Sequence, residues 1–268
     1  MLTDEVIPFK SPEQYLSTDF VSKRNMAAWI KQQPLVAAQD YCRNLLIKRK
    51  EKKNLVYSPS QVELRSLPMP SIITYQNLFG DYYKLCEGLG FKNKYRNTNQ
   101  FKWVNINSAF NEIIIDSRES LPLHIEHPTQ IQCLNYGDYA LDKPELNQRI
   151  FIERKEIKDA INSFTKNLER FIKEIGRAEQ DAANLIVIVE LSLSDALSFN
   201  YIPYIKRFTK LTPEFLFRNI RDLIQNYNIQ FLFVKNKQES AEMVKKILLS
   251  NGEIKNYDVQ LLYDEKKL

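Results

Sequence analysis

Residues 151–159 read FIERKEIKD, and this stretch decides how the second half of the chain is interpreted. It starts apolar and leads into an amphipathic segment, which predicts a buried strand that runs directly into a helix. Side chains alternate along a strand, so we expect Glu153 and Lys155 on one face and Arg154 on the other. The end of this strand therefore presents an acidic side chain, Glu153, and a basic side chain, Lys155, on the same face.

Two further acidic residues occur at predicted strand ends. The short apolar run Ile113–Asp116 ends in an aspartate, and Asp138 lies in the stretch YGDYAL. We expect residues 130–141 and 149–155 to pair as a hairpin, which would place Asp138 beside Glu153. The end of the first strand can reach the same place if that strand is their neighbour in the sheet.

Three carboxylates at one point repel one another and require a cation to stay ionised together. Mg²⁺ prefers oxygen ligands and retains waters, and such an ion activates water and stabilises charge on a phosphoryl group. The lysine beside it would position the water or offset negative charge. The pattern predicts phosphodiester hydrolysis with Mg²⁺ or, as a substitute, Mn²⁺, although acidic strand ends also serve simply to protect sheet edges.

The surrounding segments predict an α/β fold. Apolar residues between Ile157 and Ile175 recur at helical spacing, and Leu185–Leu191 is a buried strand of the parallel kind. Thr212-Pro213 starts another helix, residues 229–234 form another strand, and residues 239–249 form a last helix. This order implies a mixed β-sheet flanked by helices on both faces.

The longer pattern is more specific. The string IIIDSRE, then GDY, then IERK with an aspartate at position 159, resembles the nuclease domain of the XPF family, within the restriction-endonuclease-like PD-(D/E)XK superfamily. The resemblance covers about residues 111–250. It implies a restriction-endonuclease-like sheet and a metal-dependent DNA endonuclease.

The resemblance also implies roles for individual residues. Asp116, Asp138 and Glu153 would be the metal ligands. Lys155 would be the catalytic lysine, and Glu119 a possible additional ligand.

Other charged positions match the family pattern as supporting residues. Arg118 and Arg154 would contact phosphate or brace the carboxylates. Asp159 would support the site from the start of the helix, and Arg170 is a weaker match to an arginine of the family.

The front of the chain has a different character. Residues 1–105 carry 16 basic and 9 acidic residues, a net charge of +7, whereas residues 106–268 carry 22 basic and 24 acidic ones, a net charge of −2. A basic half suggests a polyanionic partner, whereas the basic run at 48–53 taken alone is better explained as a solvated surface. We therefore divide the chain into a mainly helical DNA-binding region, 1–105, and a nuclease domain, 106–268.

Within the helical region, residues 66–92 predict a helix-turn-helix. Pro70-Ser71 opens the first helix, Gly80 ends it, Asp81 caps the second and Gly90 stops it. This stretch resembles the homing-endonuclease-associated repeat, a small DNA-binding module. The matching residues are Pro70, Ser71, Tyr75, Phe79, Gly80, Tyr82, Leu85 and Gly90.

Four basic residues are the candidates for contact with DNA phosphates, because such contacts position a protein without reading sequence. They are Lys84, Lys92, Lys94 and Arg96. A helical hairpin whose aromatic residues only form a core remains the alternative interpretation of this module.

Several classes of function are excluded or disfavoured. The 3 cysteines are isolated and form no CxxC pair, which disfavours a disulfide framework or a thiolate zinc site. His124 and His127 lack further zinc ligands nearby in the sequence. The N-terminus is not a secretion signal, and no apolar run is long enough for a membrane span, so we expect a cytoplasmic protein.

Three functions remain open at this point. The first is a structure-selective endonuclease for branched or flapped DNA in repair or recombination, as the resemblance implies. The second is a sequence-specific endonuclease of the restriction or mobile-element type. The third is a catalytically silent DNA-binding or assembly subunit, which the complete acidic motif disfavours. The resemblance also suggests a homodimer formed through the nuclease domain.

Overall fold

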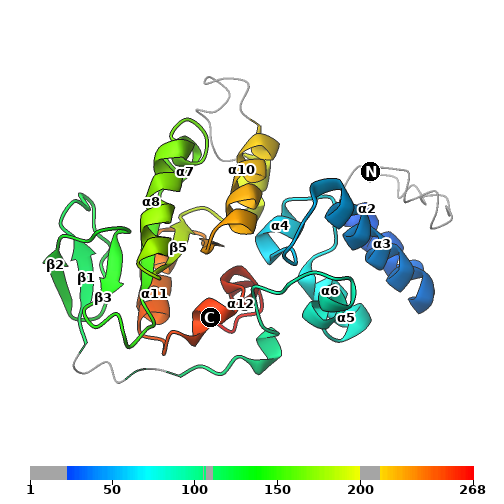
Figure 1. The fold of residues 1–268 in the computed structure, drawn as a ribbon, viewed down its shortest axis with the longest axis horizontal. Coiled ribbons are helices and arrows are strands. Elements are labelled where there is room, and N and C mark those ends of the chain that lie inside the picture. Colours follow the sequence, from blue (N-terminus) through cyan, green and yellow to red (C-terminus); the bar gives the residue numbers. More distant parts are fainter. Residues whose placement is uncertain (1–22, 105, 107–110, 200–211) are drawn as a thin grey trace, which may run out of the picture. The chain divides into compact units, whose positions relative to one another are not determined.

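The structure is a computed structural model that describes residues 23–104, 106, 111–199 and 212–268. The described chain divides into two compact units (Figure 1). The first consists of the residues up to Ser58 together with Leu67–Asn93, and the second of Pro59–Ser66 together with Lys94–Leu268. The sequence also predicted helix within residues 1–22, which lie outside the described part. The functional division at residue 105 stays a prediction.

The first unit is helical, as predicted. Its described helices are α2 (Lys23–Gln32), α3 (Leu35–Lys53), α5 (Ile72–Phe79) and α6 (Tyr82–Gly88). Trp29 packs edge-on against Tyr41, with 4.7 Å between ring centroids. The Tyr75 hydroxyl donates to the carbonyl oxygen of Cys42 at 3.3 Å, so α5 is fastened to α3.

The predicted helix-turn-helix is present in this unit. Ser71 caps α5 through the backbone N–H of Thr74, and Asp81 caps α6 through the backbone N–H groups of the second and third residues after it. Between them Gly80 takes a φ of 78°, a conformation that glycine adopts without steric cost. Ser71, Gly80 and Asp81 therefore perform the backbone roles expected of them.

The second unit is built on a six-stranded mixed sheet with the strand order β2-β1-β3-β4-β5-β6. Strand β3 runs antiparallel to both β1 and β4, and the other neighbouring pairs are parallel. The strands are β1 (Ile113–Asp116), β2 (Thr129–Gln132), β3 (Tyr139–Leu141), β4 (Ile150–Lys155), β5 (Asn184–Val189) and β6 (Ile229–Phe233). The sequence-based prediction of an α/β fold with a mixed sheet and a preceding helical region is confirmed.

Helices cover both faces of this sheet (Figure 1). The described helical segments of the unit are α4 (Gln61–Arg65), η1 (Thr98–Gln100), α7 (Ile157–Ser163), α8 (Leu168–Gln180), α9 (Leu193–Ser198), α10 (Pro213–Asn226), α11 (Lys237–Leu248), η4 (Glu253–Asn256) and α12 (Val259–Asp264). Among the described residues, none of the helices combines the length and the apolarity that crossing a bilayer requires.

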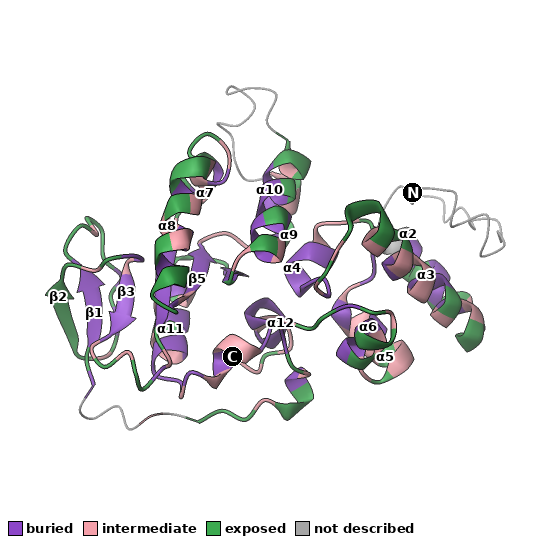
Figure 2. Ribbon diagram, viewed as in Figure 1, coloured by how far each residue is buried: buried purple, intermediate pink, exposed green. Residues whose placement is uncertain are grey.

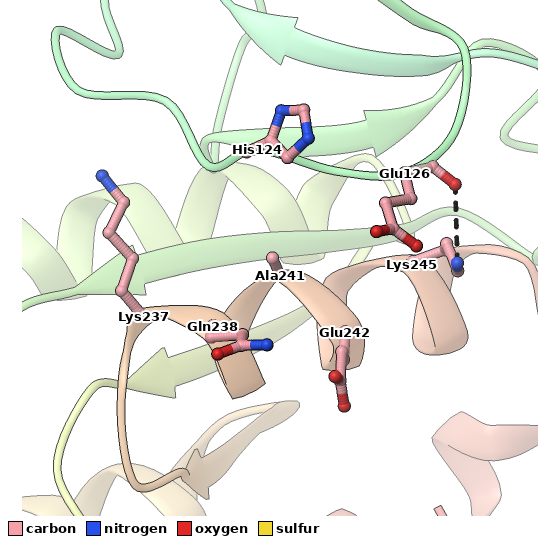
Figure 3. Close-up of a pocket in the computed structure, with 7 residues that line it drawn as sticks. All are labelled: His124, Glu126, Lys237, Gln238, Ala241, Glu242 and Lys245. Carbon is pink, nitrogen blue, oxygen red and sulfur yellow. Dashed lines mark hydrogen bonds between the residues drawn. The ribbon is translucent and has the colours of Figure 1, made fainter.

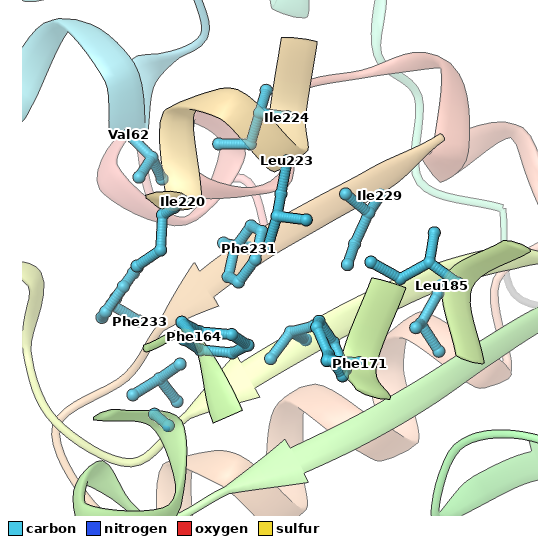
Figure 4. Close-up of a cluster of buried hydrophobic side chains, with 14 of the residues drawn as sticks. Val62, Phe164, Phe171, Leu185, Ile220, Leu223, Ile224, Ile229, Phe231 and Phe233 are labelled. Atoms are coloured by element: carbon cyan, nitrogen blue, oxygen red, sulfur yellow. The ribbon is translucent and has the colours of Figure 1, made fainter. Parts of the chain in front are cut away.

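Alternation along the strands sorts the buried side chains into two cores. Leu185 and Val187 of β5 join Phe164 and Phe171 in a core with α7, α8 and α10 (Figure 4). The intervening Ile186 belongs to the opposite core, which contains side chains of α11 and α12. Because each face of the sheet has its own helical layer, the face on which a strand residue lies decides which helices it meets.

Two predicted elements are wrong in extent. Residues 130–141 do not form one strand, because β2 pairs with the outer side of β1 while β3 pairs with its inner side. The chain must therefore turn between them, and β2 remains exposed while β1 and β3 are buried (Figure 2). The helix predicted across Ile157–Ile175 is also broken, and the Thr165 hydroxyl at the break donates to the carbonyl oxygen of Ile161.

A short segment between the two parts of the first unit belongs to the second one. Residues of α4 contact helices near the C-terminus, as Gln61 donates its backbone N–H to the Asp258 carboxylate at 2.6 Å and Arg65 pairs with Asp264 at 2.9 Å. Helix α12 and this attachment have no counterpart in the sequence-based prediction.

Candidate active site

The ends of three adjacent strands bring the predicted catalytic residues to one face of the sheet. Strand β3 pairs with β4 so that Tyr139 lies opposite Ile152, and both side chains enter the core under α11 and α12. The next residues of this register, Asp138 and Glu153, therefore point to the other face, toward α7 and α8. Asp116 lies on the same face, since Ile114 two residues before it belongs to that core.

A glycine allows the close approach of these strands. Gly137 has a φ of 69°, and a Cβ atom there would lie 3.0 Å from the carbonyl oxygen of Ile152. The same carbonyl accepts the backbone N–H of Asp138 at 2.7 Å. The glycine of the GDY string is therefore required by the backbone that presents Asp138.

Glu153 and Lys155 form a buried ion pair on this face. The side chain of Glu153 is 7% exposed, that of Lys155 is 17% exposed, and the ammonium donates directly to the carboxylate. The Lys155 Nζ also lies 6.0 Å from the centre of the Phe171 ring of α8. Burial lowers the pKa of Lys155, but the charge and hydrogen bond of Glu153 together with the charges of Asp138 and Glu174 raise it by more, so the lysine remains a cation.

Asp138 and Glu153 oppose each other's ionisation. Burial raises the pKa of both carboxyl groups, and the charge of Asp138 raises that of Glu153 further. One oxygen of Asp138 is fixed, because it accepts the backbone N–H of Arg154 at 2.7 Å. Two buried carboxylates in this state are stabilised by a cation placed between them.

The third predicted carboxylate, that of Asp116, is hydrogen-bonded to an arginine and a backbone N–H group. Asp116 accepts two hydrogen bonds from the guanidinium of Arg118, at 2.8 and 2.7 Å, and the backbone N–H of Leu134 at 2.8 Å. The hydrogen bonds from the Arg118 side chain lower the pKa of Asp116 to about 2. Among the described residues, no three acidic, histidine or cysteine side chains stand together as a metal-binding group. The expected meeting of three carboxylates is therefore only partly formed here.

The two arginines of the predicted motif, Arg118 and Arg154, differ in how far their side chains are exposed. The side chain of Arg118 is 66% exposed beyond its contact with Asp116, so it is accessible to a phosphate. That of Arg154 is only 5% exposed and pairs with Glu190 at 2.8 Å and with Glu119 at 3.6 Å. Both guanidinium groups therefore brace carboxylates, Arg118 that of Asp116 and Arg154 those of Glu190 and Glu119, and of the two only Arg118 is also exposed.

Two acidic residues near the site were not predicted. Besides burial and nearer groups, the charge of Glu174 on α8 contributes to the raised pKa values of Asp138 and Glu153. Glu174 stands one helical turn after Phe171, the residue beneath Lys155. Glu190 directly follows β5 and holds Arg154. The helical spacing of α8 and the sequence LIVIVE at the end of β5 mark the positions of Glu174 and Glu190. Neither pattern shows which part of the sheet these two residues contact.

The remaining predicted residues have simpler environments. Asp159 is exposed in the first turn of α7, where a negative charge is favourable. Lys84 and Lys92 are exposed on the first unit, and Arg96 pairs with Glu253 at 3.1 Å. These positions are compatible with the predicted contact with phosphate.

Lys94 is different, because its ammonium serves the fold. It donates to the carbonyl oxygen of Tyr227 at 2.8 Å and to that of Ile224, at the C-terminal end of α10. Burial lowers the pKa of Lys94. To reach a phosphate, this ammonium would have to leave two carbonyl groups that it caps.

A pocket of about 470 Å³ lies between the loop after β1 and helix α11 (Figure 3). Lys237 and Lys245 donate to the carbonyl oxygens of Leu121 and Glu126 on that loop, and His124 lines the pocket opposite α11. None of its lining residues is a predicted catalytic residue. Mixed acidic and basic side chains give it no clear preference for a ligand charge.

A family model and two solved structures are similar to parts of this chain. Residues 115–247 match the ERCC4 domain, a segment that contains every strand from β2 to β6 together with Asp116, Asp138 and Glu153. No curated protein sequence matches the chain significantly.

Two solved structures from Aeropyrum pernix are similar to the chain over about half of its length. XPF is 17% identical with a TM-score of 0.39, and its complex with DNA is 18% identical with a TM-score of 0.40. Both alignments cover 51% of this chain, and they cover 59% and 62% of the two solved chains. This chain therefore spans less than two thirds of the structures that it resembles.

Proposed function

We propose that this protein is a divalent-metal-dependent DNA endonuclease whose active site contains Asp138, Glu153, Lys155 and Asp116. The observation that carries the proposal is the buried pair of carboxylates with raised pKa values beside a lysine ammonium, within the segment that matches the ERCC4 domain. Structural packing alone does not explain two acidic groups that destabilise each other's charge.

The side chains present fit a hard divalent cation. Asp138 and Glu153 supply oxygen donors, and a cation between them would offset the burial that raises both pKa values and the charge repulsion that raises that of Glu153 further. Asp116 would join them after exchanging its contact with Arg118. When bound, Mg²⁺ or Mn²⁺ would lower the pKa of a water molecule and stabilise negative charge on the scissile phosphate.

Two cationic side chains of the protein, Lys155 and Arg118, would act on the water and on the DNA phosphates. Lys155, which keeps its positive charge, would orient the attacking water and offset charge that develops on the phosphate. Arg118, released from Asp116, is the exposed cation closest in sequence to this site and would bind a neighbouring phosphate. Hydrolysis would leave a 5′-phosphate and a 3′-hydroxyl.

We propose the structure-selective form of this activity, on branched or flapped DNA in repair or recombination, and we place DNA binding partly on the basic first unit. Lys84 and Lys92 are exposed there, and phosphate contacts of this kind need no base sequence. Sequence-specific cleavage is the second candidate, since a paired-helix module of this size is also used to read DNA bases. A homodimer and a cytoplasmic location remain proposals.

The decisive assay incubates the full chain and Mg²⁺ or Mn²⁺ with fork, flap and nicked DNA and with a library of linear duplexes. The proposal expects cleavage near the branch point, its loss in Glu153→Gln, and full activity in the control Glu145→Gln, which alters an exposed loop residue. Cleavage at one fixed duplex sequence would favour the second candidate. Cleavage of no substrate with either ion, or full activity of Glu153→Gln, would refute the proposal.

A further inference from the structure

The Arg154 guanidinium is buried on the face of the sheet opposite to Glu153 and Lys155. Its Nε donates to one oxygen of Glu190 at 2.8 Å, and its Nη2 donates to the other at 2.9 Å. The side chain of Glu190 is itself only 7% exposed. A two-pronged pair of this kind fixes the plane of a guanidinium, because both oxygens and two nitrogens are engaged.

The same arginine contacts the loop that follows β1. Its Nη1 donates to the carbonyl oxygen of Leu121 at 3.2 Å and lies 3.6 Å from the Glu119 carboxylate. Two residues later, the backbone N–H of Leu123 donates to the hydroxyl of Tyr139 at 2.9 Å. The loop is therefore held at one end by Arg154 and at the other by β3.

Arg154 also contacts the proposed catalytic face through its backbone. Its N–H donates to the Asp138 carboxylate at 2.7 Å, across the gap between β3 and β4. The position of this N–H depends on how the end of β4 is held, and the side chain of Arg154 ties that end to the residue that follows β5. One residue thus links Glu190, the loop after β1 and the orientation of Asp138.

We infer that Glu190 is a positioning residue of the proposed active site, acting through Arg154 on Asp138 and on the loop of residues 117–123. The inference rests on the proposed function only for its catalytic consequence. Without the Glu190 carboxylate, the Arg154 guanidinium stays buried with its main charge partner removed. It must then draw in water or turn toward Glu119, and either change loosens its hold on the end of β4 and alters its contacts with the loop.

The chain offers a matched control at the same guanidinium. Glu156 approaches Arg154 Nη2 at 3.5 Å, but its side chain is 55% exposed. Solvent screens an exposed pair, so the loss of its charge changes little. Glu156→Gln and Glu190→Gln thus remove the same charge from two partners of one arginine, and only the second is expected to matter.

The first test is hydrogen–deuterium exchange of the full chain, followed by mass spectrometry of peptides that cover residues 117–123. Glu190→Ala should raise exchange in this loop by about ten-fold or more, because a buried pair has lost one partner. Glu190→Gln, which keeps an oxygen acceptor, should show a smaller increase, and Glu156→Gln none. Unchanged loop exchange in both Glu190 variants would overturn the inference.

The second test is cleavage kinetics on the substrate that the wild type prefers. The inference expects kcat of Glu190→Gln to fall by about ten-fold with KM for DNA within about two-fold, since binding surfaces are intact. A fall in kcat that merely follows a loss of folded protein, measured by its thermal unfolding, would contradict a positioning role. If the wild type cleaves no DNA, the proposed function fails, whereas loop exchange still decides whether Glu190 holds the loop.

Discussion

Replacing Asp138 by asparagine should stabilise this protein, although the residue is a proposed metal ligand. Burial raises the pKa of Asp138 from its ordinary value of 3.8 to about 6, so the folded state opposes its ionisation. Asparagine removes that charge and retains the side-chain oxygen that accepts the Arg154 N–H. The repulsion between this group and Glu153 is removed at the same time.

The expected magnitude follows from linkage between protonation and folding. A tenfold change in proton affinity corresponds to about 1.4 kcal/mol, so the raised pKa costs the ionised protein roughly 1 to 3 kcal/mol, part of it shared with Glu153. Because the folded pKa is raised, the folded state binds the proton more tightly than the unfolded state. The cost is therefore absent below pH 3.8, grows as the pH rises toward about 6, and is complete above that value.

Urea unfolding of the wild type and the variant at pH 4 and pH 8, without divalent ions, measures this difference. The free energy of unfolding of Asp138→Asn should exceed that of the wild type at pH 8 and approach it at pH 4. Asp222→Asn, an exposed change on α10, is the control and should have no effect at either pH. A variant that is less stable than the wild type at pH 8 would refute the electrostatic account of this pair.

Two further predictions concern groups outside the site. Burial raises the pKa of Cys42 and of Cys86 to about 12, whereas Cys133 is exposed, so a thiol reagent should modify Cys133 alone in the native protein. Rapid native labelling of all three thiols would contradict the packing of the first unit. Lys94→Met should lower the free energy of unfolding by about 1 to 3 kcal/mol because two carbonyl groups lose their donor. Lys92→Met, at an exposed position, is its control, and equal destabilisation of both variants would oppose this role.

Sequence periodicity predicted those features of the fold that depend only on neighbouring residues within one strand or helix. The alternation in IERK placed Glu153 and Lys155 on one face and Arg154 on the other, and the structure confirms this separation. The capping residues Ser71 and Asp81 likewise predicted the helix pair of the first unit. In these cases the information is local, because strand alternation and cap hydrogen bonds span only a few residues.

Features that depend on distant parts of the chain were not predictable in this way. The prediction of one continuous strand over residues 130–141 is wrong because β1 lies between β2 and β3 in the sheet, and no local sequence pattern records this order. Lys94 donates to Ile224 and Tyr227, which lie 130 and 133 positions further along the chain. Because no local pattern records these bonds, the positive charge of Lys94 alone led to the prediction of phosphate contact. Glu190 was visible as the end of an apolar run, but its partner is 36 positions away.

Manganese titration is the most direct test of the claim that Asp138 and Glu153 together hold a divalent cation. Electron paramagnetic resonance of free Mn²⁺ in the presence of the full chain reports binding without any need for catalysis. The account predicts saturable binding by the wild type and an affinity lower by about ten-fold or more in Glu153→Gln, with Glu145→Gln unchanged. Equal Mn²⁺ affinity of the wild type and Glu153→Gln would contradict it.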